Sequence, residues 1–214
     1  MRVLFAHGFE GAPDGGKPTY MSEVLGWDVV APVRSEKGWN IEQETDVLLE
    51  YIDAGNFDLI AGSSMGGLAA ANASALRPDA EFGLLLIAPA FGLAEMWHDR
   101  LTAAEMGEWE REDAYAYRGF ELNISLGWDF MQTAERMSWP KLNHPTVILH
   151  GTQDDIVPIE KSKRVAHEDS NVVALMEIED GHRMQEAKEY FAKATEMCLR
   201  TYRGPCCGAN DRSL

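Results

Sequence analysis

The sequence is short of cysteine, and this shortage excludes a disulfide-stabilised secreted domain. Three cysteines occur among 214 residues, and two of them, Cys206 and Cys207, are adjacent in a polar C-terminal segment. No disulfide framework is available to such a chain, so the thiols indicate a reducing compartment. The apolar run that follows Met1 ends at His7, which is too early for a secretory signal peptide. We therefore expect a cytoplasmic protein.

Long apolar runs and a surplus of cations are also missing. The longest apolar runs, such as residues 82–90, are much shorter than the roughly 20 residues of a membrane helix, so we expect no membrane partner. Lysine and arginine total 19 against 35 aspartates and glutamates, and the formal charge of −16 repels phosphate backbones. We expect no nucleic-acid partner. The 45% of hydrophobic residues is enough to build a sizeable globular core.

Short apolar segments alternate with helical patterns along the chain. The strand-like segments are residues 2–6, 27–31, 57–61, 82–88, 146–150 and 172–178, and the helical ones are 20–25, 41–54, 66–76, 160–168 and 184–202. Apolar strands that are separated by helices form parallel sheets covered by helices on both faces. We predict an α/β fold with about six mostly parallel strands, in a single domain of residues 1–203.

A long insertion, residues 91–143, separates the fourth and fifth predicted strands and contains four of the six tryptophans. Long insertions in compact α/β domains are often functional, for example as lids over a ligand site. A helical hairpin that packs its aromatic side chains onto the core is the alternative. We predict two or three short helices that form a lid, with Trp97, Trp109 and Trp128 as candidate substrate-binding residues. Residues 204–214 are predicted to be a flexible tail.

Residues able to carry chemistry follow three of the predicted strands. Gly62-Ser63-Ser64-Met65-Gly66-Gly67 lies between strand 57–61 and an alanine-rich helix, which is the GxSxG pattern in a strand–turn–helix setting. The sharp turn needs glycine because the chain segments approach closely, and it presents Ser64; a glycine-rich helix start is the alternative. Asp154 and Asp155 follow strand 146–150, and His182 follows strand 172–178.

The carboxyl ends of parallel strands form one edge, where open α/β sheets bind ligands. A serine hydroxyl is a poor nucleophile until a histidine takes its proton, and a carboxylate must orient that histidine. Neighbours in extended chain point to opposite sides, so only one of Asp154 and Asp155 can face His182. We expect His7 to brace its loop, and no metal or cofactor is predicted. The remaining histidines, expected on loops or at the surface, are His98, His144, His150 and His167.

With these motifs the sequence resembles the α/β-hydrolase superfamily, from His7-Gly8-Phe9 to Gly181-His182. It is most similar to small bacterial serine esterases with a His-Gly-Phe loop and a Gly-Ser-Ser-x-Gly-Gly elbow. The segments after Asp154 and His182 are also similar to the mitochondrial acyl-glucuronide esterase and acyl-protein thioesterase group. The resemblance implies a minimal α/β-hydrolase fold and a catalytic triad of Ser64, Asp154 and His182. It further implies an oxyanion hole made by the backbone N–H groups of Phe9 and Met65.

We therefore predict a serine carboxylesterase that cleaves small-molecule esters with an apolar acyl or aryl group through an acyl-enzyme, without a cofactor. A thioesterase of the same fold is the nearest alternative, followed by a non-catalytic ligand-binding homologue. A P-loop nucleotide hydrolase is the weakest alternative. Gly11 to Lys17 fit GxxxxGK, but Pro18 stands where a magnesium-binding serine or threonine belongs, and proline has no N–H for phosphate. Chain-length preference and oligomeric state stay open.

Overall fold

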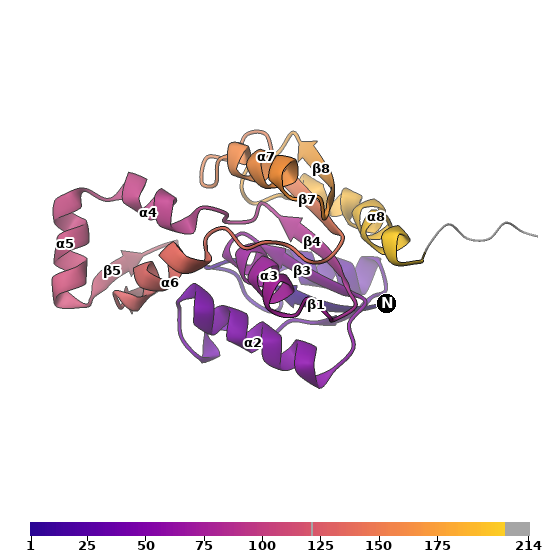
Figure 1. Cartoon of the computed structure of the whole chain (residues 1–214), viewed down its shortest axis with the longest axis horizontal. Helices are drawn as coiled ribbons and strands as arrows, with labels where there is room; N and C mark the ends of the chain where they lie inside the picture. Colours follow the sequence, from indigo (N-terminus) through magenta and orange to yellow (C-terminus); the bar gives the residue numbers. More distant parts are fainter. Residues whose placement is uncertain (121, 204–214) are drawn as a thin grey trace, which may run out of the picture.

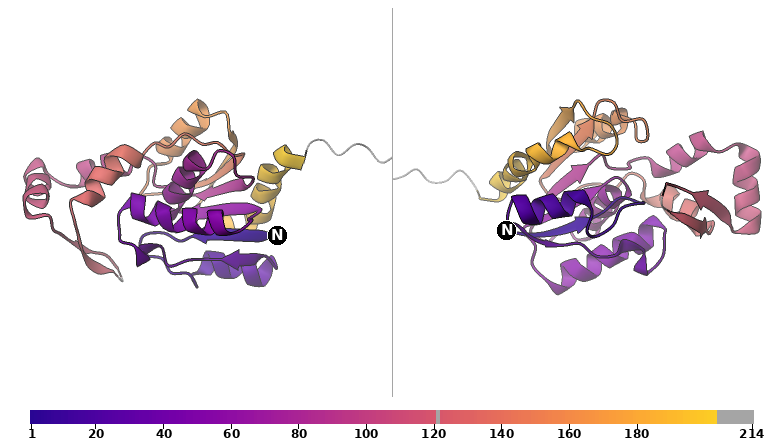
Figure 2. Two further views of the ribbon diagram at one scale, coloured as in Figure 1. Left: turned by 60° about the horizontal axis from the view of Figure 1, so that its bottom comes forward. Right: turned by 180° about the vertical axis from the view of Figure 1, so that it is seen from behind.

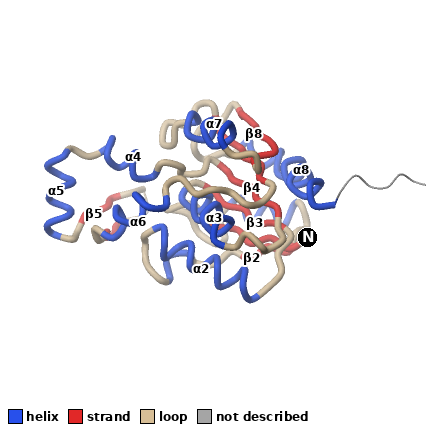
Figure 3. The backbone as a smooth tube through the Cα atoms, in the orientation of Figure 1, coloured by secondary structure: helices blue, strands red, loops and turns tan. Residues whose placement is uncertain are grey.

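A parallel sheet of six strands forms the centre of the molecule in the computed structural model, which describes residues 1–120 and 122–203. The strands lie in the order β2-β1-β3-β4-β7-β8, and every neighbouring pair is parallel (Figures 1 and 3). Their bounds are β1 Arg2–Ala6, β2 Asp28–Val30, β3 Leu59–Ser63, β4 Gly83–Ile87, β7 Thr146–Gly151 and β8 Val172–Ile178. The predicted α/β class and strand number are confirmed. The predicted tail, with Cys206 and Cys207, lies outside the described residues.

Both faces of the sheet are buried, which explains why its strands are apolar throughout. Leu4 and Ala6 of β1 pack into one hydrophobic cluster, whereas Val3 and Phe5 pack into the other. The helices on the first face are α2 Ile41–Ala54, α3 Met65–Leu76 and α7 Ile159–Glu168, and those on the second are η1 Tyr20–Val24 and α8 Phe191–Arg203 (Figures 1 and 2). Within the described residues no helix is both long and apolar enough to span a bilayer.

Two predicted helices have different bounds in the structure. The predicted helix 184–202 is divided into the 3₁₀-helix η3, Glu186–Tyr190, and α8, and Met184 precedes both with a φ of 47° that a right-handed helix cannot contain. The helix predicted at 20–25 is the π-helix η1, which follows the four-residue α1, Gly16–Thr19. The GxxxxGK segment therefore leads into the consecutive α1 and η1, which end at Val24, rather than into the long α-helix that follows a phosphate-binding loop.

The insertion lies beyond the carboxyl ends of the strands (Figures 1 and 2). Its helices are α4 Leu93–Arg100, α5 Ala103–Glu112 and α6 Asp129–Met137. It also contains an antiparallel hairpin of β5, Tyr115–Arg118, and β6, Asn123–Leu126, which the sequence analysis missed. Trp109 is 1% exposed, and its Nε1 donates to the Leu126 carbonyl at 2.9 Å, so a hydrogen bond joins α5 to the hairpin.

Candidate active site

Ser64 occupies the turn between β3 and α3, with φ 55° and ψ −123°. Its N–H donates to the Ile87 carbonyl at 2.9 Å, and its own carbonyl accepts from the N–H groups of Leu68 and Ala90 at 3.1 and 3.0 Å. A Cβ atom on Gly62 would collide with the Gly66 carbonyl, and one on Gly66 would collide with the Ala6 carbonyl. The glycines of GxSxG are therefore required by close backbone approach.

The structure brings Ser64, His182 and Asp154 together. His182 Nε2 lies 3.0 Å from Ser64 Oγ, and its Nδ1 lies 2.8 Å from Oδ2 of Asp154. A carboxylate only accepts, so Nδ1 carries the ring proton and Nε2 faces the serine hydroxyl. Of the two neighbouring acids, Asp154 contacts His182, whereas Asp155 is exposed to solvent.

The Asp154 side chain is fully buried and meets four hydrogen-bond donors. Oδ1 accepts from the N–H groups of Ile156 and Val157 at 3.0 and 2.8 Å. Oδ2 faces His182, and His150 Nε2 lies 3.2 Å from the same oxygen. Burial alone would raise the pKa of the Asp154 carboxyl. Hydrogen bonds from His150, His182 and the Val157 N–H outweigh burial and hold this pKa well below its usual range.

His150 and His144 are both fully buried. His150 belongs to β7, so its expected loop or surface position is wrong, whereas His144 lies on a loop, as expected, but inside the protein. The ring of His144 stacks on that of Phe82 with the ring centroids 3.7 Å apart. Its Nδ1 is hydrogen-bonded to the Ser74 hydroxyl and its Nε2 to the Ala80 carbonyl. The burial of His150 could have been predicted from the alternation of side chains along the strand. His150 lies two residues after the buried Ile148 and is therefore on the same face of β7. The expectation was right for His98 and His167, which are exposed.

The loop after β1 runs over the serine. A Cβ atom on Gly8 would lie 3.5 Å from the Cβ of Ser64. Within the described part of the chain, the backbone N–H groups of Phe9 and Met65 donate to no protein acceptor, and Met65 is the first residue of α3, where helical N–H groups lack an internal partner. His7 Nδ1 lies 2.9 Å from the Gly8 carbonyl. Burial and the nearby Arg34 charge lower the pKa of His7 to about 4, which keeps its ring neutral at pH 7.

Two cavities of different character meet at Ser64. The first, of about 340 Å³, is mainly apolar, and its wall includes Phe9, Leu93, Met96, Trp97, Phe130 and Val157. The second, of about 560 Å³, also reaches His182 and is bordered by charged side chains, namely Lys17, Arg100, Arg183 and Glu10. Lys17 Nζ donates to the Arg183 carbonyl at 2.9 Å, and burial together with the Lys188 charge lowers the pKa of Lys17 to about 8.

Comparison with known proteins identifies the family. Residues 2–198 match UPF0227, which is described as an uncharacterised protein family. The chain belongs to UPF0227. The mouse (Mus musculus) protein "Palmitoyl-protein thioesterase ABHD10, mitochondrial" is 30% identical over 140 residues, which are 60% of this chain and 46% of that protein. The match therefore spans about half the length of this curated relative.

Solved structures extend the likeness of this UPF0227 chain to the whole fold. "Alpha/beta hydrolase domain-containing protein 10 from mouse" superposes with a TM-score of 0.74 at 21% identity, over 95% of this chain and 90% of that one. Est1E from Butyrivibrio proteoclasticus superposes with a TM-score of 0.68 at 18% identity, over 95% and 88% of the two chains. The predicted α/β-hydrolase fold is confirmed.

The three tryptophans predicted to bind substrate have different surroundings in the UPF0227 protein. Trp97 lines the apolar cavity. Trp109 and Trp128 line neither of the two cavities at Ser64. The Trp109 ring packs behind Trp97, with the two ring centroids 5.3 Å apart. The centroid of the Trp128 ring lies 5.5 Å from that of Trp109. These two residues therefore support the cavity wall from behind instead of forming its surface.

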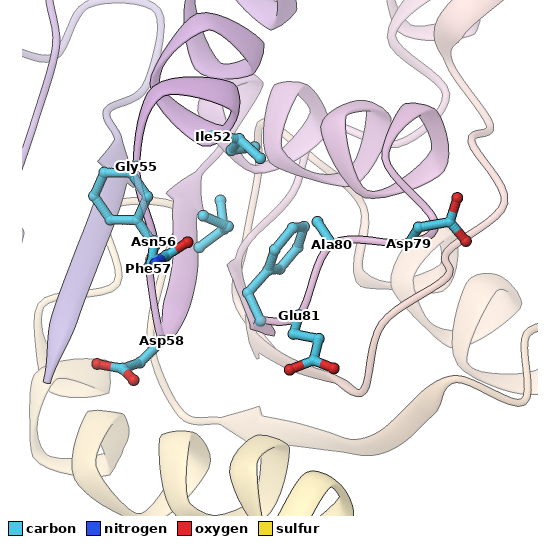
Figure 4. Close-up of a pocket in the computed structure, with 10 residues that line it drawn as sticks. Ile52, Gly55, Asn56, Phe57, Asp58, Asp79, Ala80 and Glu81 are labelled. Atoms are coloured by element: carbon cyan, nitrogen blue, oxygen red, sulfur yellow. The ribbon is translucent and has the colours of Figure 1, made fainter.

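A third cavity, of about 500 Å³, lies at the amino ends of the strands, where β3 and β4 begin (Figure 4). The carboxylates of Asp58, Asp79 and Glu81 surround it, and Phe57 is among its apolar lining residues. Its lining residues include no serine, cysteine or histidine, so they offer no activated nucleophile. In residues 1–120 and 122–203, no group of three or more histidine, cysteine or acidic side chains is arranged to hold a metal ion.

Proposed function

We propose that this UPF0227 protein is a serine hydrolase that cleaves carboxylic esters with an apolar acyl or aryl group through an acyl-enzyme. One observation carries the proposal: Ser64, His182 and Asp154 form a hydrogen-bonded chain beside an apolar cavity, at the carboxyl edge of the sheet. The names of the relatives, a thioesterase and a protein of the α/β-hydrolase fold, support a carbonyl substrate.

The reaction begins when Ser64 Oγ attacks the carbonyl carbon and His182 Nε2 takes the hydroxyl proton. Asp154 stabilises the imidazolium through Nδ1–H and stays ionised because of its lowered pKa. The negative oxygen of the tetrahedral intermediate accepts hydrogen bonds from the N–H groups of Phe9 and Met65. His182 then protonates the leaving oxygen, and a water molecule, activated by the same histidine, hydrolyses the acyl-enzyme.

The two cavities suit the two halves of an ester. The apolar cavity accepts the acyl or aryl group, because its aromatic and methionine side chains bury nonpolar area without demanding specific polar partners. The charged cavity accepts the more polar leaving group. In this proposal residues 91–143 act as a lid within the single domain 1–203, because Trp97 and Arg100 of α4 border the cavities. The free, buried thiol of Cys198 is compatible with the cytoplasmic location that we propose.

A thioesterase is the second candidate, favoured by the name of the mouse relative. The two activities share the acyl-enzyme and differ in the leaving atom. We therefore suggest comparing p-nitrophenyl butyrate with a butyryl thioester of N-acetylcysteamine. We expect the wild type to hydrolyse the ester with the higher kcat/KM, and a higher value for the thioester would favour the alternative.

Ser64→Ala tests the nucleophile in the same assays. Removal of a triad serine costs roughly 10⁴-fold or more in kcat, so this variant should lose nearly all ester hydrolysis while Ser63→Ala keeps most of it. An undiminished rate in folded Ser64→Ala would overturn the proposed function.

A further inference from the structure

His150 is the next-to-last residue of β7, and its ring is enclosed between the sheet and α7. Its Nε2 lies 2.9 Å from the Val157 carbonyl oxygen and 3.2 Å from Oδ2 of Asp154. Its Nδ1 lies 2.7 Å from Oγ of Ser162, which belongs to α7. Both ring nitrogens therefore have partners, and these partners come from the loop that carries Asp154 and from the covering helix.

The chemistry of these partners fixes where the ring proton is. Carbonyl oxygens only accept, so Nε2 of His150 carries a proton and donates it to the Val157 carbonyl, while Oδ2 of Asp154 lies 3.2 Å from the same nitrogen. The Ser162 hydroxyl can donate to Nδ1 or accept from it, and in either case it fixes the rotation of the ring. The ring is thus oriented by α7, independently of the acid that it contacts.

Asp154 needs such an external contact. Its Oδ1 is held by two backbone N–H groups of its own loop and lies 3.0 Å from His182 Nδ1, but these contacts converge on one oxygen. The direction of Oδ2 is set by what meets that oxygen, namely His182 on the cavity side and His150 on the buried side. His182 is 15% exposed and borders the charged cavity, whereas His150 is completely enclosed. The rigid partner of Oδ2 is therefore His150.

We propose that His150 is a positioning residue for the triad, which holds the Asp154 carboxylate with Oδ2 directed at His182 Nδ1. The inference rests on the proposed function, because this orientation matters for catalysis only if His182 acts as the base. Its effect passes through Asp154 and not through contact with the substrate, since His150 lines neither cavity at Ser64. Loss of the contact should lower kcat and leave KM nearly unchanged.

Two substitutions separate the hydrogen bond from the volume of the ring. His150→Gln keeps an N–H donor near the position of Nε2, whereas His150→Met keeps a large side chain without a donor. A matched control exists in His144, which is equally buried and doubly hydrogen-bonded but contacts Ser74 and Ala80. His144→Met should therefore reproduce the loss of a buried imidazole without affecting the triad.

The variants are compared by kcat and KM on p-nitrophenyl butyrate, by thermal unfolding, and by the low-field ¹H NMR signal of the hydrogen bond between His182 and Asp154. We expect His150→Met to lower kcat by up to about 10²-fold and to abolish the low-field signal, because misplacement of a catalytic group by about 1 Å has an effect of this size. His150→Gln should recover most of kcat and the signal. His144→Met should lower the Tm and leave both unchanged.

Two results would overturn the inference: a wild-type kcat and low-field signal in His150→Met, or equal losses of kcat in His150→Met and His144→Met. If His150→Met does not fold, Ser162→Ala takes its place, since it leaves the imidazole but removes its fixed rotation. Ser162→Ala should lower kcat by a smaller factor with KM unchanged, and an unaltered kcat would contradict the inference. The proposed function fails separately, through activity that survives in Ser64→Ala.

Discussion

Two residues of the candidate site are held in states that would be unfavourable elsewhere in a protein. Ser64 has a φ of 55°, a conformation that costs about 1–3 kcal/mol for a residue with a side chain. Asp154 keeps a charge inside the protein. Each is stabilised by its neighbours: hydrogen bonds to Ile87, Leu68 and Ala90 fix the serine backbone, and four donors surround the carboxylate. Strain and buried charge of this kind are typical of functional sites.

The adjacent acids Asp154 and Asp155 should respond differently to substitution. Asp154→Asn preserves shape but favours the wrong tautomer of His182, and in a well-studied triad this costs about 10⁴-fold in kcat. Asp155→Asn should cost less than about tenfold, since the side chain is exposed and does not contact His182. Parallel kinetics on both folded variants check this expectation. A larger loss in Asp155→Asn would transfer the orienting role.

The Asp154 carboxylate should also make stability depend on pH. The folded protein lowers the pKa of Asp154, so below about pH 5 the unfolded chain binds more protons at this position than the folded one does. The stability that ionised Asp154 contributes is therefore complete above that pH and declines as the pH falls toward the folded value. We expect the difference in unfolding free energy between the wild type and Asp154→Asn to shrink from pH 5 to pH 3 in urea titrations. A constant difference would be inconsistent with a lowered pKa.

Among the helices and strands, those of the insertion supply part of the wall of the apolar cavity, and their aromatic cluster fixes that part in place. Trp97 of α4 lines the cavity, and Trp109 of α5 packs behind the Trp97 ring. The ring centroids of Trp109 and Tyr115 of β5 lie 4.9 Å apart. The hydrogen bond from Trp109 to Leu126 joins the cluster to β6. Surface residues of the wall and residues behind it should therefore respond differently to substitution.

Trp97→Ala should shift the substrate preference of the protein toward longer acyl groups, because the removed ring enlarges the apolar cavity. Trp109→Ala should instead lower the unfolding free energy by about 3–5 kcal/mol and leave the preference unchanged. Relative kcat/KM values on p-nitrophenyl acetate, butyrate and octanoate, together with urea unfolding, distinguish the two effects. Equal shifts of preference in both variants would contradict the division between surface and support.

A buried ion pair joins the 3₁₀-helix η2, Arg34–Glu36, to α2. Arg34 and Glu44 are each 1% exposed and form a direct ion pair. Arg34→Met leaves the Glu44 carboxylate buried without its partner, so we expect a loss of about 3–5 kcal/mol in unfolding free energy. The double variant Arg34→Met/Glu44→Leu should recover most of this loss, because both charges are removed. Urea unfolding of the three proteins checks the prediction, which fails if the single and double variants are equally destabilised.

Much of the sheet was predictable from sequence because both of its faces are buried. A strand such as β4, Gly83–Ile87, is apolar at every position, and the glycines around Ser64 mark the turn that follows β3. The candidate triad was predictable for the same reason, since each member follows a recognisable strand. The resemblance to known hydrolases then distinguished Asp154 from Asp155.

The features that were missed depend on contacts between segments distant in sequence. The hairpin strands β5 and β6 have four residues each, and their pairing is stabilised by aromatic packing against α4 and α5 rather than by a strong local pattern. His150 was expected on a loop or at the surface instead of inside the protein. Its burial depends on hydrogen-bond partners in α7 and in the following loop, which composition does not reveal.

At the scale of the whole molecule, the candidate site is a property of the parallel sheet. Ser64 is 118 residues from His182 along the chain, and Asp154 is 28 residues from it, yet hydrogen bonds join all three. They meet because β3, β7 and β8 run in the same direction and end at one edge. The two hydrophobic clusters on the faces of the sheet hold these strand ends in register. Nucleophilicity at Ser64 should therefore exist only in the folded chain.

Labelling with a fluorophosphonate probe shows directly whether Ser64 is an activated nucleophile, because the probe reacts with an activated serine and does not require knowledge of the substrate. The folded wild type should be modified at Ser64, as located by peptide mass spectrometry. No labelling is expected in urea-unfolded wild type, in folded Ser64→Ala or in folded His182→Ala. Modification of a different serine, or undiminished labelling of Ser64→Ala, would contradict the assignment of Ser64 as the nucleophile.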